Sequence, residues 1–278
     1  MQDEKWQSYL YPNGTLRNKF GIQNPSQLRV LEYELVKKRT RELKLNPVKG
    51  NFDLKHLQKI HNSLFQDIYE WAGEIRNVDM RKGDSVFCKI SSISQRSEEF
   101  HKALKENNFL KDLEKSSFIR KLAVFYGEMN IIHPFREGNG RATRQFFTQL
   151  SQEVGYDLGL RTIDKGLWNW ASEQSFQGSD IFLEKIFEKS VRPLRAVSYE
   201  IDKPADAIKK YPELVDAYAA QEVFKKFLAK KTQWPASEKQ AAAEKAQARI
   251  QDSLDKGMLP SGIKIVPPEG TKPRRMKP

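Results

Sequence analysis

The chain of 278 residues lacks several features that mark whole classes of protein. It has a single cysteine, Cys88, so no disulfide can form within one chain, and a disulfide-stapled secreted fold is excluded. No apolar run approaches the ~20 residues that a helix needs to span a bilayer. Residues 1–5 lack the basic and apolar regions of a signal peptide. These absences predict residence in a reducing cytosol, with export by a signal-peptide-independent machine as the open alternative.

Charge is plentiful but not concentrated. The net charge of +12 would suit nucleic acid, an acidic protein surface or a polyphosphate. The basic excess is spread along the chain, so charge alone selects no partner, and nucleic-acid binding stays open.

Apolar residues recur mainly at helical spacing. Asp53 is a predicted N-cap, and Ser237, with a glutamine three residues later, is predicted to open the last helix. The stretch that holds Trp168, Trp170 and Phe176 is predicted to be a connecting segment. The predicted helices cover residues 28–45, 53–71, 94–106, 117–132, 141–154, 179–190, 212–231 and 237–256.

A small hairpin interrupts this helical pattern. Residues 75–78 and 85–90 are rich in strand-forming side chains and flank the turn-forming segment 81–84. The predicted fold is therefore mainly α with one small hairpin.

The composition shifts toward alanine and lysine after residue 193, which predicts a boundary. We expect a main domain over residues 1–195 and a helical appendage over residues 196–259. Residues 260–278 hold five prolines and a basic end, which predicts an extended or disordered tail. A solvated tail is favoured over a specific binding device.

Residues 133–144 concentrate groups that suit phosphate chemistry. Pro134 disfavours helical dihedrals at His133, so the preceding helix should stop there and a loop should run to Gly140. Gly138 and Gly140 let backbone N–H groups converge, and a helix from Arg141 would aim its positive end the same way. The segment therefore predicts an anion site.

The side chains of this segment add to the prediction. Asn139 supplies a donor, and Arg141 and Arg144 lie three residues apart on one helix face, where they could clamp outer phosphates. Glu137 offers one carboxylate, which suffices for Mg²⁺ because that ion keeps several waters. His133 can accept a proton from a hydroxyl at neutral pH. These groups predict nucleotidyl or phosphoryl transfer.

Each residue alone has a plainer interpretation. His133 would be a structural histidine, Glu137 a surface acid, and the arginines a solvated helix face. A chance loop rarely combines all of them behind an apolar helix, so the joint pattern favours a site. The other three histidines, His56, His61 and His101, lie within helical patterns and are predicted to be structural.

The segment matches in full the Fic-family signature, His-x-Phe-x-(Asp/Glu)-Gly-Asn-Gly-Arg-x-x-Arg. Residues 68–76 resemble the segment that leads into that family's flap, and residues 11–22 are similar to its entry segment. The resemblance covers roughly residues 9–195. It implies a Fic-type helical bundle that transfers AMP from ATP to a hydroxyl of a target protein.

The resemblance also implies a role for each signature residue. His133 would deprotonate the target, Phe135 would anchor the loop, and Glu137 would hold Mg²⁺. Phosphates would be seated by Asn139 and the amides of Gly138 and Gly140, and by Arg141 and Arg144 further out. Gly140 argues against a kinase-like branch that carries lysine there. The target-docking flap would comprise Asp79, Met80, Arg81, Lys82, Gly83, Asp84, Ser85, Val86, Phe87 and Cys88.

Many members of the family carry an inhibitory motif, Ser/Thr-x-x-x-Glu-Gly/Asn, whose glutamate pairs with the last signature arginine. Here that arginine is Arg144. Three glutamates precede a glycine or an asparagine: Glu106, Glu137 and Glu269. The residues four positions before them are Lys102, His133 and Ile265, none of which is serine or threonine. The resemblance therefore suggests a small separate antitoxin that supplies the glutamate to Arg144.

Two functions of different classes stay open. One is a bacterial AMP-transferase, which is either a cytoplasmic toxin acting on its own cell, for instance on topoisomerases, or an effector secreted into another cell, where small GTPases are the usual targets. The other is a nucleotide-binding delivery module without productive transfer, whose basic tail contacts nucleic acid or a secretion machine.

Overall fold

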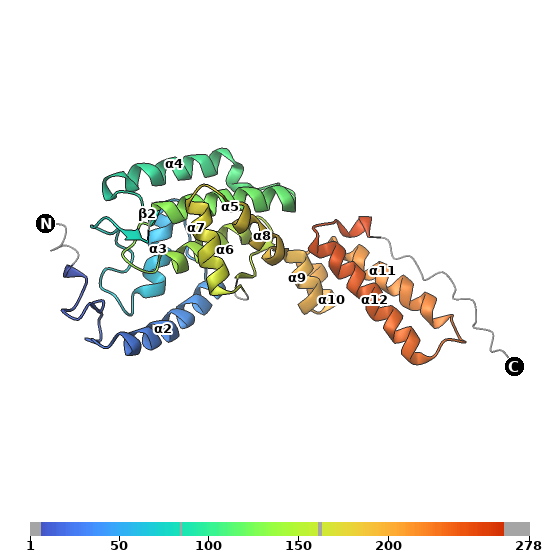
Figure 1. The fold of residues 1–278 in the computed structure, drawn as a ribbon. Coiled ribbons are helices and arrows are strands. Elements are labelled where there is room, and N and C mark those ends of the chain that lie inside the picture. Colours follow the sequence, from blue (N-terminus) through green and yellow to red (C-terminus); the bar gives the residue numbers. More distant parts are fainter. Residues whose placement is uncertain (1–6, 84, 161–162, 264–278) are drawn as a thin grey trace. The chain divides into compact units, whose positions relative to one another are not determined.

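The computed structural model describes residues 7–83, 85–160 and 163–263 and divides into two compact units (Figure 1). One unit comprises Met1–Val154 and Leu158–Val191. The other comprises Gly155–Asp157 and Arg192–Pro278. Asp84 of the predicted flap and most of the predicted tail lie outside the described residues. No helix within the described ranges is both long enough and apolar enough to cross a membrane.

The described part of the first unit is mainly helical, with one hairpin and an isolated bridge between Leu10 and Leu16. Its central helix, α5, packs against α4, α6, α7 and α8, while α3 packs against α2, α4 and α6. Asn24 caps α2 and Asp53 caps α3 through side-chain bonds to backbone amides. The helices are α2 Pro25–Leu45, α3 Leu54–Phe65, α4 Ile93–Glu106, α5 Lys115–Ile132, α6 Asn139–Glu153, α7 Lys165–Phe176 and α8 Ile181–Ser190, with 3₁₀ turns at Ile90–Ser92 and Asn108–Leu110.

Aromatic side chains fill the core between α5 and α6. Phe146 and Phe147 of α6 are fully buried, and the Phe147 ring lies 5.1 Å from that of Tyr126 on α5. Phe118 at the other end of α5 is fully buried as well. This packing fixes the two helices on either side of the signature segment.

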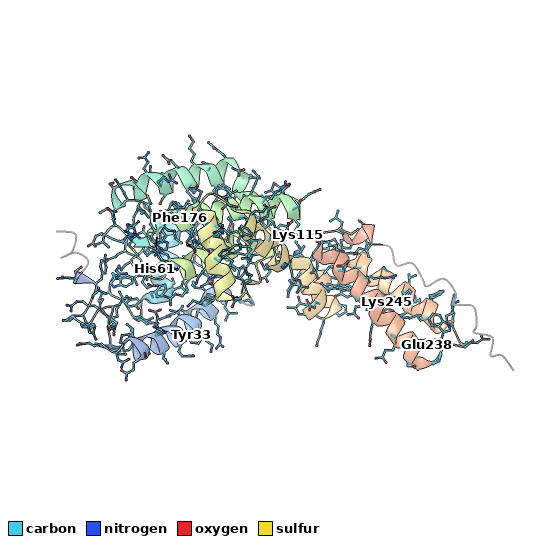
Figure 2. All side chains as sticks on the ribbon, viewed as in Figure 1. Tyr33, His61, Lys115, Phe176, Glu238 and Lys245 are labelled. Atoms are coloured by element: carbon cyan, nitrogen blue, oxygen red, sulfur yellow. The ribbon has the colours of Figure 1, made fainter. Side chains whose placement is uncertain are left out.

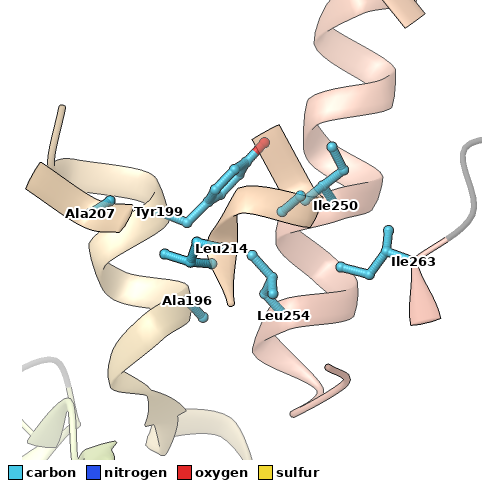
Figure 3. Packing of buried hydrophobic residues seen from close by; sticks show 8 residues of the cluster. Ala196, Tyr199, Ala207, Leu214, Ile250, Leu254 and Ile263 are labelled. Atoms are coloured by element: carbon cyan, nitrogen blue, oxygen red, sulfur yellow. The ribbon is translucent and has the colours of Figure 1, made fainter. Parts of the chain in front are cut away.

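The second unit begins with a two-stranded sheet, β3 (Tyr156–Asp157) against β4 (Arg192–Pro193). Leu214 lies at the centre of its core, where Ala196 and Tyr199 meet Ile250 and Leu254 (Figure 3). Arg192 pairs with Glu200 and Asp255 at 2.7 and 2.8 Å. The helices are α9 Leu194–Ile201, α10 Pro204–Lys210, α11 Leu214–Ala229 and α12 Ala236–Asp255, followed by a 3₁₀ turn at Pro260–Gly262.

The predicted class, a helical bundle with a small hairpin and further helices near the C-terminus, is confirmed. Several details were wrong. The helix predicted over residues 53–71 ends at Phe65, because Ile68 and Tyr69 are buried in turns rather than in a helix. The segment predicted to connect helices around Trp168 is α7, which Asp164 caps.

The hairpin strands are β1 (Arg81–Lys82) and β2 (Ser85–Val86), so they occupy the predicted turn and its edge. Residues 75–78 form no strand, and residues 90–92 form a 3₁₀ turn. Helix α12 starts at Ala236, directly after a proline, and its N-terminus has no side-chain cap, so Ser237 is not the cap. The sheet β3–β4 and helices α9 and α10 were not predicted.

Candidate active site

Helix α5 stops where the sequence predicted. His133 is its C-cap residue and adopts left-handed dihedrals, φ 47° and ψ 59°, before Pro134. Its backbone amide still donates to the Met129 carbonyl at 3.2 Å. The chain therefore leaves α5 sharply and turns toward α6, which begins at Asn139. The predicted loop is thus shorter than expected, since Asn139 and Gly140 belong to the first turn of α6.

Two hydrogen bonds of the Asn139 side-chain amide close the interior of this loop. The Asn139 side chain accepts from the Phe135 amide at 2.8 Å and donates to the Phe135 carbonyl at 2.7 Å. Phe135 is fully buried, as an anchor must be. Since both ends of the Asn139 amide are engaged, its first task is to hold the loop closed, and its predicted role as a phosphate donor stays a prediction.

His61 supports the loop and is buried within the helices of the first unit (Figure 2). Its Nδ1 accepts from the Gly73 amide at 2.9 Å, so Nε2 carries the proton and donates to the Glu137 carbonyl at 2.9 Å. The ring stacks on Phe135 with 3.9 Å between centroids. Burial lowers the pKa of His61 to about 4. His61 is structural, as predicted, but it braces the candidate site itself.

Gly138 and Gly140 serve the loop differently. Gly138 has φ +81°, and a Cβ there would lie 2.4 Å from Phe65 Cζ, so only glycine fits. A Cβ on Gly140 would meet nothing within 4 Å. Among the described residues, no acceptor takes a hydrogen bond from the backbone amides of Asn139 and Gly140. These amides, together with the positive end of α6, form a ready anion site.

Acidic groups hold Arg141 on two sides. Its guanidinium donates to Glu32 of α2 and lies 3.4 Å from Glu137 Oε1, with the Phe65 ring 4.6 Å away. Glu32 also accepts from the Tyr69 hydroxyl. Burial raises the pKa of Tyr69, and the negative charge of Glu32 adds to that effect. The first signature arginine is therefore engaged within the protein, and its predicted contact with phosphates would require it to share or leave these partners.

Arg144 differs from Arg141. It is partly exposed and has no hydrogen-bond or ion-pair partner within the described part of the chain. Its charge opposes the rise in the pKa of buried Tyr126, so the guanidinium lies close enough to that hydroxyl to act on it. Arg144 is thus the signature cation that is available to an anion from outside.

Glu137 is exposed, and one of its oxygens is already used. Oε1 accepts from the Gly138 amide at 2.9 Å as well as from Arg141. No group of three or more potential metal ligands of the His, Cys, Asp and Glu types occurs in the described ranges. A metal that takes a single protein carboxylate and completes its shell with water and phosphate, as Mg²⁺ does, fits this donor set.

The His133 ring is poised as a base. Its Nδ1 lies 3.2 Å from the Asn130 carbonyl, which can only accept, so Nδ1 carries the proton and Nε2 keeps its lone pair. Burial lowers the pKa of His133 to about 4, and the charges of Arg76 and Lys82 act in the same direction. The residue as a whole is half-buried. His133 is therefore neutral at pH 7.

The predicted flap is a hairpin next to His133. Arg81 pairs with Val86, and Lys82 pairs with Ser85, and the side chains of Arg81, Lys82 and Val86 are exposed. Phe87 is the exception. It is buried and stacks on the His133 ring, with 3.7 Å between centroids and 10° between planes. Phe87 is thus part of the floor beneath the hairpin rather than of its docking surface.

Sequence reasoning missed three residues that shape this site. Glu32 holds Arg141, His61 holds the Glu137 carbonyl, and Arg76 donates to the His133 carbonyl at 2.8 Å. Of the three, only Arg76 could have been found from the sequence, because it is the last residue of the segment 68–76 that resembles the family. Glu32 and His61 lie in ordinary helical patterns that say nothing of their distant partners.

Comparison with known proteins points to one family. Residues 51–151 match the model of the Fic/DOC family. The probable protein adenylyltransferase Fic of Escherichia coli K12 is 40% identical over 185 residues, which cover 66% of this chain and 91% of that protein. Protein adenylyltransferase VbhT of Bartonella schoenbuchensis is 33% identical over 178 residues, which cover 64% of this chain and 37% of that protein. The crystal structure of BepC from Bartonella tribocorum, a VirB-translocated effector with bound AMPPNP, has a TM-score of 0.65 and 31% identity, and the match covers 67% of this chain and 97% of that one.

Proposed function

The chain belongs to the Fic/DOC family, and on that premise we propose that it transfers AMP from ATP to a hydroxyl side chain of a target protein. One observation carries the proposal. The proton on His133 Nδ1 faces the Asn130 carbonyl, which leaves Nε2 as a base at the mouth of an anion site. A module that only held nucleotide would have no use for a neutral imidazole in that tautomer.

The proposed step is a substitution at the α-phosphorus. The target hydroxyl oxygen forms a bond to that phosphorus while the bond to the oxygen bridging the α- and β-phosphates breaks, and pyrophosphate leaves. The hydroxyl proton goes to His133 Nε2. An anionic triphosphate next to the ring favours the protonated imidazole, so bound nucleotide would raise the pKa of His133 from about 4 and make it a stronger base.

The loop and helix α6 would hold the phosphates. The amides of Asn139 and Gly140 and the guanidinium of Arg144 have no partner among the described residues, so they are available to phosphate. Glu137 would hold Mg²⁺ through its carboxylate, and the ion would neutralise charge on the phosphates. For the Gly138 amide to contact phosphate, Glu137 Oε1 must first release it.

The target would dock on the hairpin. The exposed side chains of β1 and β2, and the short exposed length of the strands, suit the addition of an extended target segment through main-chain hydrogen bonds. Phe87 would not contact that segment, because its ring lies under His133. The modified side chain would then lie above the imidazole.

The test uses ATP labelled at the α-phosphate or, separately, at the γ-phosphate, incubated with the full chain and a bacterial lysate. Label on a protein band from the α position only supports AMP transfer. Label from γ only indicates phosphorylation, and no label favours the delivery module. His133→Ala should abolish the label while AMPPNP binding persists. His101→Ala is the matched control and should keep the label, because among the described residues His101 bonds only to the Phe52 carbonyl.

We also propose that a small separate protein inhibits the enzyme by placing a glutamate on Arg144. Two observations support this: Arg144 has no partner in the described part of the chain, and the sequence has no inhibitory motif of its own. Expression of the chain alone should slow growth of the host cell, and His133→Ala should remove the effect. Normal growth with an active, intact enzyme present would argue against a toxin that needs an antitoxin. Delivery into another cell would then be the remaining context for the activity.

A further inference from the structure

Arg76 is a buried cation whose side-chain hydrogen bonds all go to backbone carbonyls of the candidate site. Its side chain has no exposed surface. Nε donates to the His133 carbonyl at 2.8 Å, Nη1 donates to Val78 at 2.6 Å, and Nη2 donates to Cys88. The Arg76 backbone amide adds a bond to the Pro134 carbonyl at 2.9 Å. One residue therefore joins three separate segments of the chain.

The three carbonyls belong to the parts that must cooperate in the proposed reaction. Val78 and Cys88 lie at the base of the two legs of the hairpin, and His133 carries the base. The Cys88 amide also donates to the Ile131 carbonyl at 3.0 Å, so the second leg is tied to α5 as well. The hairpin thus cannot shift against His133 without breaking bonds to Arg76.

A guanidinium suits this position for physical reasons. The carbonyls at the end of α5 carry the negative end of the helix dipole, which favours a cation there. The planar fork directs several N–H groups at once, which an ammonium on a flexible stem does not reproduce. Burial lowers the pKa of Arg76, and Asp79, 3.8 Å away, opposes that effect. The cost of burying this charge is offset only if all three carbonyls stay in place.

We propose that Arg76 is a positioning residue for AMP transfer, which holds the target-docking hairpin at a fixed distance from His133. The inference rests on the proposed function. A target segment added to the hairpin takes its position from the hairpin, whereas the imidazole takes its position from the loop. The bonds from Arg76 set the gap between them, so the target hydroxyl meets Nε2 only while those bonds are intact.

The test compares Arg76→Lys and Arg76→Gln with the wild-type full chain. Each variant should bind AMPPNP within about twofold of wild type, because Arg76 contacts none of the proposed phosphate donors. Transfer of α-label to lysate protein should fall about 100-fold, as expected for a misplacement of roughly 1 Å. The loss should lie in the maximal rate, with the apparent KM for ATP unchanged. Arg39→Lys is the matched control, because Arg39 makes a comparable fork to Asp67 and Glu42 away from the site.

A spectroscopic readout separates positioning from general stability and needs no target. The four histidine ring signals can be followed with ¹³C-labelled histidine, and His133→Ala identifies the one from His133. Stacking on Phe87 should shift the His133 signal upfield in wild type, and both Arg76 variants should lose that shift while the His61 signal keeps its position.

Parallel loss of AMPPNP binding and transfer would overturn the proposal, as would an unchanged His133 signal with unchanged transfer. If neither variant folds, slow exchange of the Arg76 Nε–H in the wild-type chain supports the hold on the His133 carbonyl, and fast exchange refutes it. If wild type itself transfers no label, the proposed function fails. The histidine ring signals and the exchange of the Arg76 Nε–H still test whether Arg76 fixes the hairpin, because neither measurement needs transfer.

Discussion

The two glycines of the loop allow a matched test of how the site is built. Gly138→Ala and Gly140→Ala add the same methyl group two residues apart. At Gly138 the methyl meets Phe65 atoms at 2.4 and 2.5 Å on a backbone with φ +81°. At Gly140 it meets nothing within 4 Å, and the backbone is helical. The two changes should therefore act on different properties of the protein.

The cost at Gly138 has two parts. An alanine in the left-handed region costs about 1–2 kcal/mol. Overpacking against Phe65, which is fully buried, adds about 1–3 kcal/mol. The free energy of unfolding should thus fall by roughly 2–5 kcal/mol, which corresponds to a drop in Tm of roughly 5–15 °C for a unit of this size.

Gly140→Ala should leave stability within about 1 kcal/mol of wild type, because alanine favours the helix and strains nothing. Nucleotide binding should nevertheless weaken about tenfold or more, since the methyl would crowd the amides proposed to face phosphate.

Calorimetry of the free chain and titration with AMPPNP measure the two effects separately. A Gly138→Ala protein as stable as wild type would show that the left-handed bend against Phe65 is not required. A Gly140→Ala protein that binds AMPPNP with wild-type affinity would remove these amides from the phosphate site.

Three further outcomes are expected. Burial lowers the pKa of His61 to about 4 from a usual 6.5, so between these pH values the unfolded chain binds a proton that the folded chain does not. This residue alone should lower the free energy of unfolding by about 3 kcal/mol as pH drops from 6.5 to 4, and urea titrations of His61→Gln should show a pH dependence that is flatter by that amount. Glu32→Ala leaves Arg141 without its main partner, so thermal unfolding should reveal a loss of about 1–3 kcal/mol, and Glu32→Gln should lose less because its amide oxygen still accepts. Leu214→Ala opens a cavity in the core of the second unit, and calorimetry should show a loss of about 2–5 kcal/mol there; a loss below 1 kcal/mol would mean that this core is poorly packed.

The sequence was most informative where local chemistry decides the structure. Pro134 and the apolar helix before it predicted the end of α5 to the residue. The end of α3 was not predictable from periodicity, because the core buries Ile68 and Tyr69 in turns just as it would bury them in a helix. The apolar pattern reports only which side chains are buried, and both a longer helix and a helix followed by turns would bury these two.

The exact strand positions of the hairpin and the supports of the site escaped prediction for a different reason. The strands are two residues each and mostly exposed, so they carry no apolar alternation to detect. Glu32 and Arg141 are 109 positions apart in sequence, and His61 and Glu137 are 76 apart. Such pairs depend on how helices pack, and a single sequence contains no signal for that contact.

The donors of the loop fall into two sets, and this division explains how the protein alone fixes the shape of the loop. The Phe135 amide bonds to the Asn139 side chain, and the Glu137 carbonyl bonds to His61, so the bend is held by the protein alone. The amides of Asn139 and Gly140 take no part in that holding, which leaves them to an outside anion. Because the bonds that hold the bend and the proposed ligand bonds use different atoms, phosphate would enter without reorganising the bend. Two local changes would accompany it: Glu137 would release the Gly138 amide, and Arg141 would share or leave its carboxylate partners. In a site built this way, little of the binding free energy of the nucleotide would be lost to rearrangement of the loop.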